Sequence, residues 1–236
     1  MRPLLAIALL LAVLSGASTA HAQGSAPPRY RIDMSVYPYQ RSVSDDVDYS
    51  AFINARITDR LSYFSFVNVK GLVTEGGTRF DRSEQNLRFA LSKELPFDFN
   101  FQGVIVNGDG NDFYQLGVGW RIHNTAAWSD WFRKVGIIYR LTFQAARLDV
   151  DDEKSWGLEH FFRWNFTDDF YLFGFVDQVF DEQQRPDVPD NPIIAEFQFG
   201  HRIWKNIFVV GEYRVNDRRA GPRENIAAGL EAQFRW

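Results

Sequence analysis

The stretch that decides the fold is Glu224–Trp236, which reads ENIAAGLEAQFRW. Alternate residues on one face of an extended strand would all be apolar: Ile226, Ala228, Leu230, Ala232, Phe234 and Trp236. The other face would be mostly polar or small: Asn225, Ala227, Gly229, Glu231, Gln233 and Arg235. Because successive side chains of a strand point to opposite faces, this period of two predicts an amphipathic strand. A tilted strand needs roughly 9–11 residues to cross a bilayer, and this stretch is long enough.

The same alternation recurs along the chain and predicts about twelve strands. The expected runs are 30–36, 47–57, 61–71, 86–92, 97–102, 114–122, 135–144, 156–166, 170–180, 193–202, 207–216 and 224–236. The links after odd-numbered runs are mostly long and polar, whereas those after even-numbered runs are mostly short turns. An even strand number with long loops at one end and short turns at the other is typical of bacterial outer-membrane barrels. We therefore predict an all-β, transmembrane, antiparallel, up-and-down β-barrel. The alternative is a periplasmic β-sandwich or lipocalin-like barrel, which would put its apolar faces inside.

The last residues add a resemblance to this prediction. Phe234 and the terminal aromatic Trp236 resemble the C-terminal signal of outer-membrane barrel proteins. The resemblance implies that these two residues form an assembly signal and that the barrel-assembly machinery is a partner.

Residues 1–22 have the three parts of a secretory signal peptide. Arg2 supplies a positive start, residues 4–14 form an apolar run, and Ala20-His21-Ala22 fits a small-x-small cleavage site. The run is shorter than the roughly 20 residues of a spanning helix, although a short N-terminal anchor is the alternative. We expect export, a short periplasmic lead-in at residues 23–28 and a barrel over residues 29–236.

Composition narrows the classes further. The chain has no Cys, so no disulfide framework stabilises an exported domain. After the signal peptide no segment approaches 18 consecutive apolar residues, so a membrane-spanning chain of this composition can only be a barrel. The aromatic content of 16% suits the aromatic girdles of such barrels. The net charge of −4 and the lack of a basic block indicate no nucleic-acid partner.

If the apolar faces meet lipid, the polar faces line the lumen. The pore-lining candidates are Arg88, Arg140, Glu159, Arg163, Phe173, Phe175, Asp177, Glu196, Arg202, Glu212, Arg214, Glu231 and Arg235. In one interpretation these charges line a water-filled channel for small polar solutes. In the other they pair across a narrow lumen and plug it. A twelve-stranded barrel is wider than the eight-stranded kind that side chains alone can fill, which favours the channel.

Two smaller patterns bear on the lumen and its rim. Phe52, Phe161 and Tyr171 join Phe173 and Phe175 in the lumen phase, as an aromatic strip for planar or sugar-like solutes or as plain packing. The link 123–133 contains Trp128, Trp131 and Phe132, and it predicts either an amphipathic segment at the membrane surface or an ordinary aromatic-rich loop.

One strand resembles a known family. Residues 169–177, DFYLFGFVD, are similar to the aromatic-Gly-aromatic-x-Asp strand of the nucleoside-specific channels, which are also twelve-stranded outer-membrane barrels. The match covers nine residues, and the Trp-rich N-terminal features of that family are absent here. The resemblance implies nucleosides as one candidate among small polar solutes.

Other functions have weaker support in the sequence. A lipid hydrolase or deacylase would need an outward Ser or His, and His160 and His201 fall in the lipid-facing phase without a His-x-Ser arrangement. We therefore predict no enzyme, no cofactor and no metal; the acidic loop 149–153 lacks a calcium-loop pattern. Arg218, Arg219 and Arg223 are candidates for contacts with lipopolysaccharide phosphate, beside other outer-membrane lipids. A barrel that acts only through its loops, without conductance, remains the third class.

Overall fold

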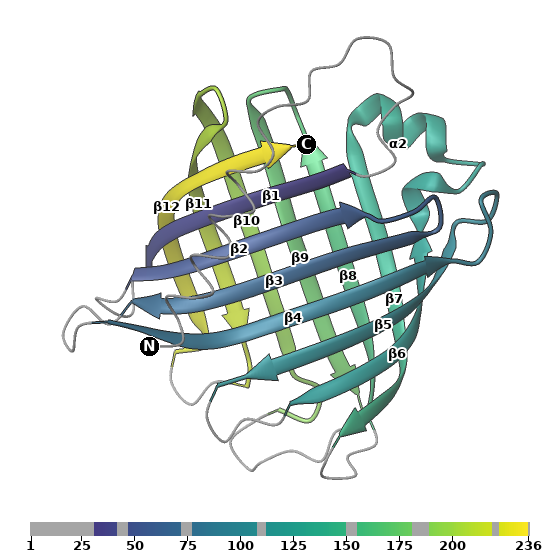
Figure 1. Cartoon of the computed structure of the whole chain (residues 1–236), viewed down its shortest axis with the longest axis horizontal. Coiled ribbons are helices and arrows are strands. Elements are labelled where there is room, and N and C mark those ends of the chain that lie inside the picture. The colour runs from purple at the N-terminus through teal and green to yellow at the C-terminus, as the bar shows by residue number, and fades with distance from the viewer. Residues whose placement is uncertain are drawn as a thin grey trace.

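The computed structural model describes residues 31–41, 47–71, 77–107, 112–149, 155–180, 189–218 and 222–235. This part of the chain contains twelve strands and two short helical segments (Figure 1). The strands are β1 (Arg31–Arg41), β2 (Val47–Arg56), β3 (Leu61–Gly71), β4 (Thr78–Ala90), β5 (Phe97–Val106), β6 (Phe113–Arg121), β7 (Ile137–Asp149), β8 (Trp156–Asn165), β9 (Phe170–Phe180), β10 (Ile193–Trp204), β11 (Ile207–Asn216) and β12 (Glu224–Arg235). The helical segments are η1 (Ile122–Asn124) and α2 (Ser129–Val135). None of the described helices is long and apolar enough to cross a membrane.

Each strand pairs antiparallel with the next one in sequence, and β1 also pairs with β12, which closes the sheet. The all-β, antiparallel, up-and-down part of the prediction is confirmed. The deciding stretch is β12, and its register places Phe234 opposite Met34 and Arg235 opposite Asp33. The predicted signal peptide, the lead-in and Trp236 lie outside the described residues.

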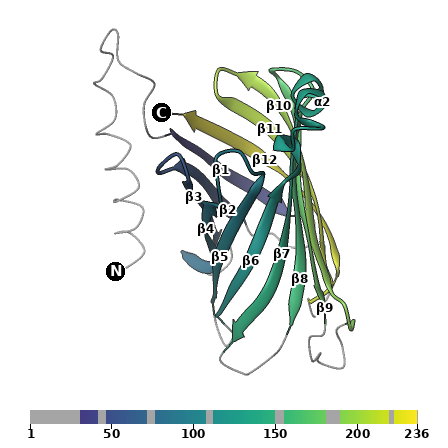
Figure 2. The same ribbon diagram turned by 90° about the vertical axis from the view of Figure 1, so that its right-hand side faces the viewer.

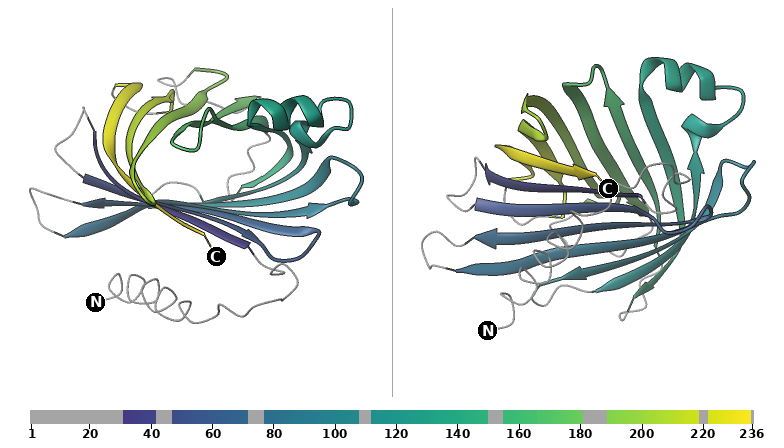
Figure 3. Two further views of the ribbon diagram at one scale, coloured as in Figure 1. Left: turned by 90° about the horizontal axis from the view of Figure 1, so that it is seen from above. Right: turned by 45° about the horizontal axis from the view of Figure 1, so that its top comes forward.

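The closed sheet is flattened into two walls. Strands β1–β6 form one wall and β7–β11 the other, and the strands of the two walls cross steeply in Figure 1, where β12 curves from the second wall to run beside β1. The side view in Figure 2 and the view from above in Figure 3 show the two walls facing each other across the interior. Side chains from facing walls can therefore meet inside the barrel.

The two faces of the sheet differ as the alternation predicted. Large apolar side chains are exposed on the outside, where Leu230 is 48% exposed and Phe89, Phe99 and Phe143 are comparably open. Polar and charged side chains are buried inside, and the neighbour of Leu230 in sequence, Glu231, is 0% exposed. This distribution is the reverse of a soluble barrel, in which apolar side chains fill the interior.

Several strand ends differ from the sequence prediction for physical reasons. β1 continues past Val36 to Arg41, although Pro38 lacks a backbone N–H and the β1–β12 register omits Tyr37 and Pro38. β4 begins at Thr78, eight residues before the predicted run. Val135 was predicted to begin a strand, but it is the last residue of α2. The helix ends there because Gly136 adopts φ +73°, the left-handed conformation that terminates helices.

The link between β6 and β7, for which the sequence left an amphipathic segment and an ordinary aromatic-rich loop open, contains η1 and the short helix α2. α2 has no buried residues, and Trp131 is 57% exposed beside the exposed Trp128. Figure 1 shows α2 at the end of the barrel where the chain also ends. Its position at a membrane surface stays a prediction.

Candidate functional site

A cluster of phenylalanines crosses the interior of the barrel. We call it the phenylalanine cluster, and its members are Phe52 of β2, Phe64 and Phe66 of β3, Phe161 of β8, and Phe173 and Phe175 of β9. Ring centroids lie 4.7 Å apart for Phe52–Phe66 and 5.4 Å apart for Phe161–Phe173. The two halves meet where Phe52 contacts Phe173 edge to face at 5.7 Å. Aromatic packing thus joins the two walls across the lumen.

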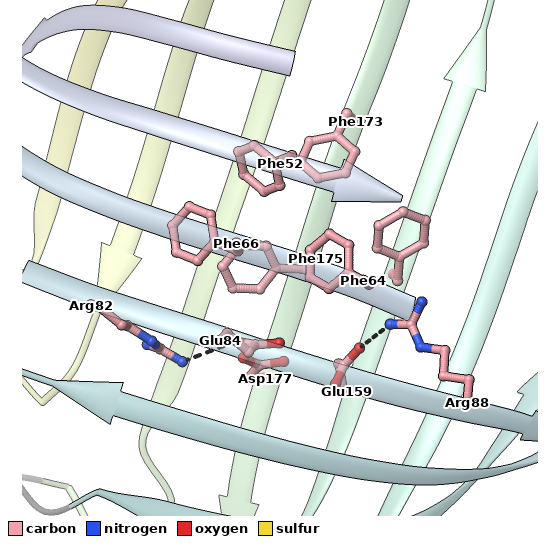
Figure 4. Close-up of a pocket in the computed structure, with 11 residues that line it drawn as sticks. Phe52, Phe64, Phe66, Arg82, Glu84, Arg88, Glu159, Phe173, Phe175 and Asp177 are labelled. Carbon is pink, nitrogen blue, oxygen red and sulfur yellow. Dashed lines mark hydrogen bonds and ion pairs between the residues drawn. The ribbon is translucent and has the colours of Figure 1, made fainter. Parts of the chain in front are cut away.

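A cavity of about 40 Å³ lies beside the phenylalanine cluster (Figure 4). By the usual minimum of roughly 10–15 Å³ for one molecule, it has room for about three waters. Its apolar side is the phenylalanine cluster, and its polar side consists of Arg82, Glu84, Arg88, Glu159 and Asp177. Figure 4 shows the three carboxylates together on one side of the rings. The lumen is therefore narrow at this level and mixed in charge.

Most charges around the cavity are held by neighbours. Arg82 Nη2 lies 3.3 Å from Glu84 Oε2, and Arg88 Nη2 lies 3.9 Å from Glu159 Oε1. Glu84 Oε1 also accepts hydrogen bonds from Asn86 Nδ2 at 2.8 Å and Gln102 Nε2 at 2.7 Å. The polar side of the cavity is consequently a connected network on β4 and β5 that faces β8 and β9.

A second polar group lies nearer the end that bears the short turns. Asp98 of β5 accepts a hydrogen bond at 2.7 Å from Arg140 of β7, and its other oxygen lies 3.3 Å from Arg121 Nε of β6. Asp98 and Arg140 are both buried. A single carboxylate between two guanidinium groups leaves this group of three residues with a net positive charge.

A third group connects β9, β10 and β12. The Tyr171 hydroxyl donates to Glu231, and Gln198 Nε2 donates to that hydroxyl at 2.5 Å. Gln233 Nε2 donates to the other oxygen of Glu231 at 2.9 Å. Gly200 of β10 makes room for this arrangement, since a Cβ there would overlap the Tyr171 ring. The buried carboxylate is thereby held on both oxygens.

The predicted pore-lining residues divide into those that gather and those that do not. Arg88, Glu159, Phe173, Phe175 and Asp177 gather around the cavity.

On β10 and β11, three of the predicted pore-lining residues form one group, because Arg214 Nε lies 2.9 Å from Glu196 and also contacts Glu212. Arg163 lies over the ring of Tyr171 at 4.3 Å, and the hydroxyl of Tyr171 donates to Glu231. Arg140 belongs to the Asp98 group described above. These residues face the interior at other levels of the barrel.

Two candidates lie apart from these groups at the short-turn end. Arg202 donates to the carbonyl oxygens of Asp168 at 2.7 Å and Lys205 at 3.0 Å. It therefore links the turn between β8 and β9 to the turn between β10 and β11. Arg235 is exposed and reaches Gln233 at 3.4 Å. Neither takes part in the network around the cavity.

Four cavity residues belonged neither to the predicted pore-lining residues nor to the predicted aromatic strip. Arg82 and Glu84 fall where a loop was expected, because their outward neighbours Ser83 and Gln85 are polar and give the segment no apolar face. Phe64 and Phe66 lie on the run whose facing was least regular. The only sequence signal for the phenylalanine cluster was the presence of aromatic residues among the polar positions of the runs 47–57 and 61–71.

The outward histidines contact aromatic groups. The Nδ1 of His160 lies 2.8 Å from the Tyr139 hydroxyl, and the His201 ring stacks on Phe170 at 4.2 Å. In the described residues no group of three or more His, Asp or Glu side chains is placed to hold a metal ion. These contacts fit amphipathic side chains on the outer face of the sheet.

The comparisons with known proteins place the fold. No protein-family model matches the chain, and no curated protein sequence matches it significantly. Among solved structures, the NanC porin is similar over 85% of this chain and 100% of its own, with a TM-score of 0.54 and 10% identity. The KdgM porin is similar over 86% of this chain and 99% of its own, with a TM-score of 0.50 and 12% identity. The chain therefore has the fold of porin-like outer-membrane barrels.

Proposed function

We propose that this protein is an outer-membrane channel that lets small polar solutes cross by passive diffusion. The observation that carries the proposal is the reversed sidedness of the closed sheet, with apolar side chains exposed outside and charged side chains buried inside. Such a surface is favourable only where lipid covers the outside. The similar folds of two porins support a channel role and no enzyme role.

The proposal includes the route of export, the assembly partner and the membrane location that the sequence predicted. The channel would be exported by its signal peptide, inserted by the barrel-assembly machinery and held among outer-membrane lipids and lipopolysaccharide. Nucleosides remain a candidate from the resemblance of residues 169–177, and planar or sugar-like solutes remain candidates from the aromatic strip in the lumen phase. Because the lumen is narrow at the phenylalanine cluster, any open pathway past the cluster has a small cross-section.

The direct experiment is the conductance of the purified protein in planar lipid bilayers. We expect discrete current steps that are small, because the phenylalanine cluster and cavity restrict the lumen. Folding is checked first by the β-sheet signal in circular dichroism. Folded protein that inserts but gives no current steps at any voltage would refute the channel.

The second candidate is a structural barrel without conductance. It is favoured by the direct contact of Phe52 with Phe173, which joins facing walls. Swelling of vesicles that contain the protein separates the two candidates. A channel swells vesicles in a small sugar or nucleoside at a rate that falls with solute size, whereas the structural barrel matches empty vesicles.

A further inference from the structure

The cavity beside the phenylalanine cluster contains one more acid than base. Two of its three carboxylates have a guanidinium partner, Glu84 with Arg82 and Glu159 with Arg88. The third, Asp177 of β9, does not. Its Oδ1 is buried and has no hydrogen-bond partner among the described residues. A carboxylate therefore faces the cavity without a donor of its own.

The neighbouring cations do not remove this deficit. Both guanidinium groups of the cavity lining are engaged elsewhere, because Arg82 Nη2 lies 3.3 Å from Glu84 and Arg88 Nη2 lies 3.9 Å from Glu159. The carboxylates of Glu84 and Glu159 line the same cavity and repel a negative charge on Asp177. A buried polar oxygen without a donor destabilises the folded protein, and more so when it is charged. A cation or ordered water in the cavity would lower this cost.

The opposite side of the cavity also favours a cation. The face of a phenylalanine ring carries negative electrostatic potential and attracts cations within about 6 Å of its centroid. The cluster already does so, because the guanidinium carbon of Arg88 lies 5.4 Å from the Phe64 centroid. A cation in the cavity would have the phenylalanine rings on one side and the Asp177 carboxylate on the other (Figure 4).

We propose that the cavity is a cation-binding site on the solute pathway, and that Asp177 with the phenylalanine cluster binds the ammonium group of an amine solute. The inference rests on the proposed channel and names its solute class. The volume of about 40 Å³ admits an ammonium group the size of methylammonium, while the rest of a larger amine extends along the lumen. The site disfavours anionic solutes through its carboxylates.

The test uses the full-length protein in planar bilayers with a gradient of methylammonium chloride. We expect the reversal potential to indicate at least a fivefold preference for methylammonium over chloride. Asp177→Asn keeps the size of the side chain and removes its charge, so this preference should fall to near unity. Asp168→Asn removes the same charge at an exposed turn and should leave the preference unchanged. An unchanged preference in Asp177→Asn, or a wild type that favours chloride, would overturn the proposal.

A second measurement separates this inference from the channel itself. Equilibrium dialysis of radiolabelled methylammonium against the protein in detergent needs no current. We expect binding to the wild type and Asp168→Asn, at least tenfold weaker binding to Asp177→Asn, and no competition by formamide or formate. If no variant conducts yet dialysis follows this pattern, the channel fails and the cation site stands. If the protein conducts but dialysis shows equal binding by Asp177→Asn, the cation site fails alone.

Discussion

Phe52 and Phe173 contact each other edge to face, with ring centroids 5.7 Å apart, although four strands separate β2 from β9 along the shorter way around the sheet. A contact between strands so far apart in the sheet can form only across the interior. It makes the phenylalanine cluster both a packing core and the constriction of the lumen.

Removing this contact should open the lumen. The double substitution Phe52→Ala and Phe173→Ala is expected to raise the single-channel conductance at least twofold, because two rings leave the constriction. The matched control is Phe89→Ala with Phe99→Ala, an aromatic pair that lies across β4 and β5 on the outside. Conductance should stay at the wild-type value there. An unchanged conductance in the inward pair would mean that the lumen is closed at another level.

The stability of the same variants tests the packing role. A double-mutant cycle on Phe52 and Phe173 should give a coupling of about 0.5–1.5 kcal/mol, as aromatic pairs do beyond their buried area. Unfolding by urea in lipid vesicles supplies the free energies. A coupling of zero would show that the two rings are neighbours without stabilising each other.

The hydrogen bond from Tyr171 to Glu231 should contribute to the stability of the barrel. Tyr171→Phe removes a donor from a carboxylate that is fully buried, although Gln233 still donates to it. We expect a loss of about 1–3 kcal/mol in the free energy of unfolding. Tyr114→Phe is the control, since its ring is exposed on the outside and stacks on Phe101. Equal losses in both variants would contradict the prediction.

The proposed membrane position can be tested through two outward leucines. Leu230 lies near the middle of β12, and Leu95 lies in the link between β4 and β5. Leu230→Arg should destabilise the barrel in bilayers by about 2–4 kcal/mol, and Leu95→Arg by about 0–1 kcal/mol, because the cost of a charge falls from the midplane to the interface. Unfolding in vesicles measures both. A similar cost at the two positions would argue against a bilayer around the sheet.

The stability of the short-turn end should depend on pH through His123 of η1. Burial lowers the pKa of His123 below its usual 6.5, and the nearby Arg121 and Arg140 act in the same direction. The unfolded chain therefore takes up a proton first as pH falls through 6.5. The stability that neutral His123 contributes is present above this pH and is lost below it. His123→Gln should show a smaller loss between pH 7.5 and pH 5 than the wild type, whereas an equal loss would contradict the assignment.

The sequence predicted the fold better than the site. Period-two alternation, as in Leu230 beside Glu231, is a local property that follows directly from strand geometry, so β12 and most other strands could be located. The contact of Phe52 with Phe173 depends on how the closed sheet flattens, which no local pattern encodes. Arg82 and Glu84 were missed because polar residues occupy both faces of that part of β4. Asp177 could be placed in the lumen, but its missing donor is visible only in three dimensions.

The register gap at Tyr37 and Pro38 lies in the seam between β1 and β12. Every other pairing joins strands that are neighbours in the chain and can form by local zippering, whereas this one brings residue 33 to residue 235. Closing so long a loop has the largest entropic cost of any pairing in the sheet. We therefore expect the seam to be the last pairing to form, and with fewer paired residues it is also where the finished ring should first come apart under strain.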